Sequence, residues 1–135
     1  MDEYNIQIGK RLRLIREIIN EGGKLSSEQF AYLVNESKDK IINYELGRSA
    51  VPVKLIYELY KRGINPTFII TGNENIFASN ENGLRLKNSI EEKLNNSNLK
   101  IEEKARLKAA LISGKEFIKI SESIMEYKVA AGKIK

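Results

Sequence analysis

Apolar residues recur every three or four positions along most of this chain, which is the spacing of amphipathic helices. Residues 5–20 show the pattern first, with basic side chains between the apolar ones, and two glycines interrupt it at residues 22–23. Similar patterns predict short helices that open near residues 26, 38, 53 and 66, and longer helical stretches beyond residue 84. We therefore expect an all-α chain.

Capping residues give the second and third helices their expected limits. Ser26 and Gln29 form a capping-box pattern, and Asn35 can end the second helix in a left-handed conformation. Ser37 is a natural N-cap for a third helix, which Gly47 would end. About three residues then separate the two helices, which is the length of the turn in a helix-turn-helix.

Two further N-terminal signals precede a polar stretch. Pro52 starts a fourth helix, and the Asn65–Pro66 pair starts a short fifth helix that stops at Gly72. Residues 72–83, with the sequence GNENIFASNENG, are polar and rich in Gly and Asn. We interpret them as a linker.

Beyond this stretch the pattern predicts two more helices, around residues 86–94 and from about residue 99 to near the C-terminus. The second carries an apolar stripe with the alternating 3-4 spacing of helix–helix interfaces. The large apolar members of the stripe are Leu107, Leu111, Phe117, Ile118, Ile124 and Met125. Gly114 is its weak point, at roughly 1 kcal/mol relative to alanine, and the helix can break there. The stripe either packs on its own chain or forms a dimer interface; we predict the dimer.

Composition narrows the possible functions. With 41% hydrophobic and 30% charged residues, the 135-residue chain can bury a modest core. It has no Cys and no His, which excludes disulfides, thiolate chemistry, the usual hydrolase triad and most zinc sites. We therefore expect neither an enzyme nor a metal or cofactor. No apolar run approaches the roughly 18 residues of a membrane span. The N-terminal sequence is not that of a signal peptide, so we expect a cytoplasmic protein.

The formal net charge of +5 is compatible with an acidic partner such as nucleic acid. The charge is unevenly distributed along the chain. Residues 1–78 carry 11 Lys and Arg against 10 Asp and Glu, whereas residues 79–135 carry 12 against 8. If residues 1–78 bind DNA, their basic side chains must therefore lie on a different face from their acidic side chains.

Residues 8–72 resemble the Cro/phage-repressor (XRE-type) helix-turn-helix family. Residues 25–47 fit the 23-residue core of that family without a gap, and the family's YE-x-G pattern stands at residues 44–47. Ala31 lies at the small position where the two helices cross, and Ile41 at the buried position of the recognition helix. The resemblance implies a five-helix DNA-binding domain in residues 1–78. The apolar pattern, without any family resemblance, adds a linker and a two-helix extension in residues 79–135.

The family resemblance also implies roles for individual side chains. The start of the recognition helix, which the family places against base edges, carries Lys38, Asp39, Lys40 and Asn43. Ser27 and Arg48 would contact phosphates. Asp39 is either a base reader or a partner of the helix dipole.

The acids in this segment fall into different cases. The resemblance pairs Glu45 with Arg16 of the first helix, as a clamp between the first and third helices. Glu36 lies in the turn, at a position that the family usually keeps apolar, and the sequence suggests no role for it.

These features predict a transcriptional regulator, most simply a repressor, that binds double-stranded DNA at a two-fold operator as a homodimer. Two other functions stay open. The first is an antitoxin-like autoregulator whose C-terminal helices bind a protein partner. The second is a helical protein-interaction module that does not bind DNA.

Overall fold

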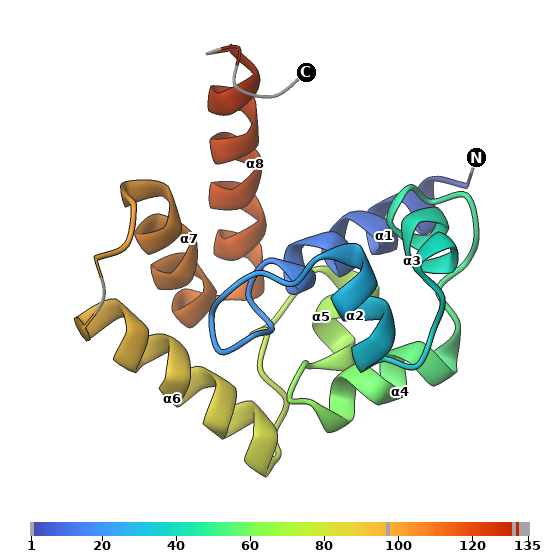
Figure 1. Ribbon diagram of the computed structural model, residues 1–135, viewed down its shortest axis with the longest axis horizontal. Helices are drawn as coiled ribbons and strands as arrows, with labels where there is room; N and C mark the ends of the chain where they lie inside the picture. The colour runs from blue at the N-terminus through green and yellow to red at the C-terminus, as the bar shows by residue number, and fades with distance from the viewer. Residues whose placement is uncertain (1, 97, 131, 133–135) are drawn as a thin grey trace.

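The computed structural model describes residues 2–96, 98–130 and 132, and these residues are helical over most of their length (Figure 1). The helices among them are α1 (Glu3–Arg16), α2 (Ser27–Leu33), α3 (Lys38–Glu45), α4 (Val53–Lys61), α5 (Pro66–Thr71), α6 (Glu81–Asn96), α7 (Ile101–Ile112) and α8 (Gly114–Ala130). The all-α prediction is confirmed.

The predicted helix ends around α2 and α3 are confirmed. The Ser26 side chain accepts from the Gln29 amide and the Gln29 side chain accepts from the Ser26 amide, which completes the capping box. Asn35 has a φ of 58° and Gly47 a φ of 75°, so both helices end in the left-handed region. The Ser37 side chain accepts from the Lys40 amide at the start of α3.

Replacing Ser26 with alanine should lower the free energy of unfolding by about 1 kcal/mol, because the first turn of α2 loses its cap. Thermal unfolding followed by circular dichroism measures the change. Ser49→Ala is the control, since Ser49 is exposed and lies outside the helices. An equal loss in both variants would contradict a capping role for Ser26.

The first helix was predicted over residues 5–20. In the structure, α1 begins at Glu3 and already ends at Arg16. The chain turns there: the Leu25 amide donates to the Arg16 carbonyl at 3.0 Å, and the Gly22 amide donates to the Ile18 carbonyl at 2.8 Å. Gly22, with a φ of 93°, supplies the conformation that this turn requires. Ile18 and Ile19, which the prediction placed in the last turn of the first helix, are still buried.

The prediction of a linker in residues 72–83 is wrong for its middle part. Ile76, Phe77 and Ala78 are buried, and the strand-like pairing of this segment with residues 63–65 holds it in place. The Asn65 amide donates to the Ile76 carbonyl at 2.7 Å, and the Ala78 amide to the Gly63 carbonyl at 2.8 Å. Three apolar residues among many polar ones are therefore enough to anchor the segment.

The helical extension contains three helices, not the two that were predicted. The last predicted helix breaks between α7 and α8, where Ser113 is fully extended with a φ of −170°. The Ser113 hydroxyl accepts from the Glu116 amide and so caps α8, while the Gly114 amide donates to the Glu74 carbonyl at 2.7 Å. From this break α8 runs away from the body, beside α7 (Figure 1).

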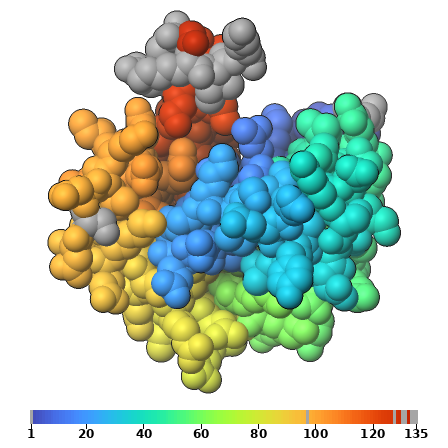
Figure 2. Space-filling view, in the orientation of Figure 1, coloured from blue at the N-terminus to red at the C-terminus, as the bar shows by residue number. Residues whose placement is uncertain are grey.

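A single cluster of buried side chains joins the helices before and after residue 80. Its centre includes Leu12, Ile41 and Phe68 from the first part, and Ile90 and Phe117 from the extension. The rings of Phe68 and Phe117 are 6.2 Å apart, in a tilted arrangement that favours aromatic packing. In the space-filling view, α6 and α7 lie directly against the α1–α2 region (Figure 2).

Candidate nucleic-acid interface

Helix α3 has one buried face and one exposed face. Ile41 and Tyr44 are buried against the body, whereas Lys38, Asp39 and Lys40 in the first turn are exposed. The buried face lies very close to α1. At Gly9 of α1 the approach is so close that a Cβ there would overlap the Tyr44 carbonyl oxygen. The close approach of α1 leaves the opposite face of α3 turned outward.

The Arg16–Glu45 ion pair joins α1 to the last turn of α3. Arg16 Nε lies 2.8 Å from Glu45 Oε2 and Arg16 Nη2 lies 2.9 Å from Glu45 Oε1, which is the bidentate geometry of a strong pair. The two side chains are only 9% and 8% exposed. Arg16 Nη1 also donates to the Leu25 carbonyl at 3.0 Å, so it holds the start of α2 as well. The hydrogen bond to Glu45 raises the pKa of Arg16, with burial acting in the opposite direction.

Glu36 has a structural role that the sequence did not suggest. One of its oxygens accepts from the Tyr44 hydroxyl at 3.4 Å, and the other lies 3.6 Å from Lys40 Nζ. Its amide donates to the Ala31 carbonyl at 2.8 Å, which closes the turn between α2 and α3. Burial, with Glu36 as a further cause, raises the pKa of Tyr44. Residues 36, 40 and 44 are spaced by four positions, but Glu36 precedes α3, so its contacts depend on how the turn places it.

The predicted DNA contacts occupy three places around this turn. Lys38, Asp39 and Lys40 form the exposed first turn of α3, and Asn43 lies one turn further along, half-buried. Arg48 follows the C-terminal end of α3 and is exposed. Residue 27, the remaining predicted contact, is the first residue of α2 and is half-buried.

The acids of this region therefore separate by position. Glu45 points inward to Arg16, and Glu36 is occupied by Tyr44 and Lys40. Asp39 is the exposed acid of the first turn of α3, where it complements the positive end of the helix dipole. Of these three acids, only Glu45 is withdrawn from the outer face of α3.

The predicted dimerisation stripe is used largely inside the chain. Leu107 and Phe117, at 2% and 0% exposure, belong to the core, so their assignment to a dimer interface is wrong. Leu111 and Ile118 pack against the same core and are partly buried. The break before Gly114 causes the difference, because it folds α7 and α8 against each other and turns their apolar faces inward. The remaining two members, at residues 124 and 125, are half-exposed beside a groove.

Two other kinds of feature were searched for in the part of the chain that the structure describes. Within it, no three acidic side chains gather closely enough to hold a metal ion. None of its helices has both the length and the hydropathy of a membrane span. Comparison with protein-family models, with curated proteins and with solved structures finds no match to this chain.

Proposed function

We propose that α1–α5 form a repressor-like helix-turn-helix domain and that α3 is its DNA-recognition helix. The observation that supports this most directly is the exposed first turn of α3 on a helix held from behind by the Arg16–Glu45 pair. Readout of base edges requires a protruding helix of fixed orientation, since a misplaced side chain loses its hydrogen bonds. The family resemblance of residues 8–72 agrees with this proposal.

The three exposed side chains of the first turn and the half-buried Asn43 each suit a particular contact in the major groove. Lys38 and Lys40 can donate to guanine O6 or N7, Asn43 can pair with adenine, and Asp39 can accept from cytosine N4. Arg48 would contact a phosphate beside the groove. Only a few charges take part, so high affinity would require two copies on a two-fold operator. Light scattering on the full chain tests the dimer.

A second candidate function is protein interaction through the same surface. Tyr32 on α2 is 90% exposed, and Leu46 at the end of α3 is 48% exposed. Exposed aromatic and aliphatic side chains are typical anchors in protein interfaces and contribute little to the reading of DNA phosphates.

A gel-shift titration against the DNA upstream of this protein's own gene, at two salt concentrations, separates the two functions. A regulator retains that fragment in preference to a scrambled duplex and loses affinity as salt rises. An interaction module leaves both duplexes unshifted even at low salt.

Two substitutions should weaken DNA binding in different ways. Lys38→Ala should reduce operator affinity about tenfold and relax the preference for the base that it contacts. Arg48→Ala should weaken all duplexes similarly and reduce the salt slope by about one. Fluorescence anisotropy with labelled operator measures both effects. Lys87→Ala, on an exposed face of α6, is the matched control. If it weakens binding as much as Lys38→Ala does, α3 is not the reading helix.

A further inference from the structure

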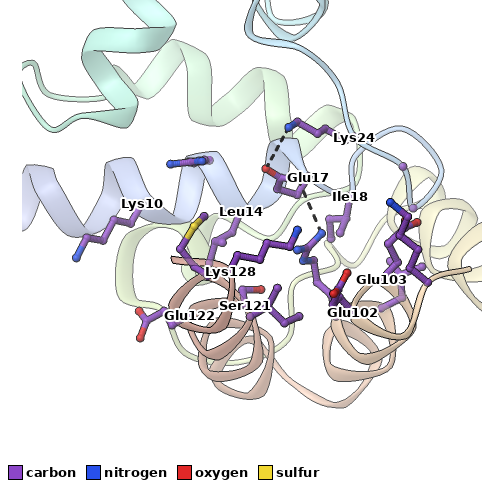
Figure 3. Close-up of a pocket in the computed structure, with 18 of the residues that line it drawn as sticks. Lys10, Leu14, Glu17, Ile18, Lys24, Glu102, Glu103, Ser121, Glu122 and Lys128 are labelled. Atoms are coloured by element: carbon purple, nitrogen blue, oxygen red, sulfur yellow. Dashed lines mark ion pairs between the residues drawn. The ribbon is translucent and has the colours of Figure 1, made fainter. Parts of the chain in front are cut away.

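A groove of about 700 Å³ lies between the second half of α1, the loop after it, α7 and the outer half of α8 (Figure 3). Apolar side chains from three helices line part of it: Leu14, Ile18, Leu107, Ile124 and Met125. Leu14, Ile124 and Met125 are only half-buried, and Val129, one turn beyond Met125 on α8, is 53% exposed. Apolar surface on both α1 and α8 is therefore in contact with solvent.

The exposed charges around this groove are sorted by sign. Those on α8 are acidic, Glu122 and Glu126, whereas those on the other segments are basic: Lys10, Arg13, Lys24 and Lys100. The half-buried charges of the lining, such as Glu17 and Lys128, do not follow this division. The accessible rim of the groove thus has an acidic edge on α8 and a basic edge opposite, with the apolar side chains between.

The charges of the two edges are not used against each other. The ion pairs among the groove residues are those of Glu17, whose oxygens lie 3.9 Å from Lys24 Nζ and from Arg106 Nη1 (Figure 3). Among the described residues, no ion pair joins Glu122 or Glu126 to the basic edge. Both acids can therefore pair with another molecule without breaking a bond of their own.

This charge pattern disfavours a partner of a single sign. Nucleic acid or an anionic bilayer would be repelled by Glu122 and Glu126, and a polycation would be repelled by Lys10 and Arg13. A fitting partner must itself carry an acidic and a basic edge on either side of an apolar strip. A second copy of this groove meets the requirement, because an isologous contact joins the same patch of both copies.

We propose that two copies of the chain associate through this groove. Glu122 and Glu126 of each copy lie against Lys10 and Arg13 of the other, and the half-buried apolar side chains of α8 pack at the centre. The outer half of α8 projects from the body and can reach a second copy (Figure 1). The inference rests on the proposed function only for the need of two copies, and it names the surface that joins them.

Reciprocal charge reversal tests the proposal on the full chain. Lys10→Glu with Arg13→Glu makes both edges acidic, and Glu122→Lys with Glu126→Lys makes both edges basic. Each double variant alone should lower the association constant about tenfold or more, because like charges then face each other. An equimolar mixture of the two double variants should recover the association, since every acidic edge then meets a basic one. Analytical ultracentrifugation at low salt and without DNA measures each sample.

Matched controls make the same charge changes away from the groove. Lys104→Glu with Lys108→Glu on α7, and Glu91→Lys with Glu92→Lys on α6, change exposed residues. Both controls should associate as the wild type does. Circular dichroism of each double variant verifies that it folds.

Three results would overturn the proposal: a wild-type chain that stays monomeric at every concentration, reversed variants that associate as the wild type does, or folded variants whose mixture stays monomeric. Because no DNA is present, these results are independent of DNA binding. A chain that dimerises through this groove but shifts no duplex refutes only the proposed function. A monomer that binds its operator refutes only this inference.

Discussion

Replacing Glu45 with alanine is expected to lower the free energy of unfolding by about 3 kcal/mol, because it leaves the charge of Arg16 buried without its partner. The contact is bidentate, at 2.8 and 2.9 Å, and both side chains are buried. Breaking a buried ion pair of this kind destabilises the fold more than breaking an exposed one. The variant should also loosen α3 from α1. Chemical denaturation measures the loss as a lower midpoint with an unchanged slope.

The ion pair of Arg85 with Glu81 on α6 is a matched control. It has a similar contact distance, 3.1 Å, but its side chains are 69% and 85% exposed. Glu81→Ala should therefore change stability by less than about 0.5 kcal/mol. Replacing both Arg16 and Glu45 with apolar residues should recover part of the loss, since no unpaired charge remains. An unchanged Tm for Glu45→Ala together with lost DNA binding would show that Glu45 contacts DNA and is not a clamp.

Replacing Gly114 with alanine is expected to lower the free energy of unfolding by about 3 kcal/mol, because a Cβ at this position would overlap the Phe68 ring. The backbone cannot shift easily, since the Gly114 amide donates to the Glu74 carbonyl. Helix propensity alone predicts the opposite sign, a gain of roughly 1 kcal/mol. Thermal unfolding therefore distinguishes packing from propensity at a single residue.

Gly132 provides the control for this substitution. It has a φ of 73°, and none of the described residues comes within 4 Å of a Cβ there, so Gly132→Ala tests backbone conformation without crowding from them. We expect it to destabilise by no more than about 1 kcal/mol. If Gly114→Ala proves stabilising, the junction of α7 and α8 is not packed against α5 as the structure has it.

Local signals predicted the helix ends well, because a cap depends on residues only three or four positions apart. The Ser26–Gln29 box, the left-handed Asn35 and the Asn65–Pro66 start are all of this kind. Arg16 and Glu45 are 29 positions apart, and family resemblance alone suggested their pairing. Glu36 was missed because its partners depend on how the turn places α3.

The extension was predicted less well, because its structure depends on contacts distant in sequence. Ile76 and Phe77 looked like isolated apolar residues in a polar linker, yet they complete the core beside α5. The stripe from Leu107 to Met125 suggested one helix with a weak point at Gly114. The helix does break there, where the Gly114 amide donates to the Glu74 carbonyl, so the extension has one helix more than predicted. Nothing in the sequence indicated that α7 and α8 would line a groove together with α1.

The most direct test of DNA recognition by α3 is selection of bound duplexes from a random library by the full chain. Recognition by α3 in a dimer predicts an enriched motif with two-fold symmetry and half-sites roughly 34 Å apart. It also predicts that Asn43→Ala loses the preference for adenine at one position in each half-site. If the wild-type chain enriches no motif at low salt, α3 does not read DNA sequence.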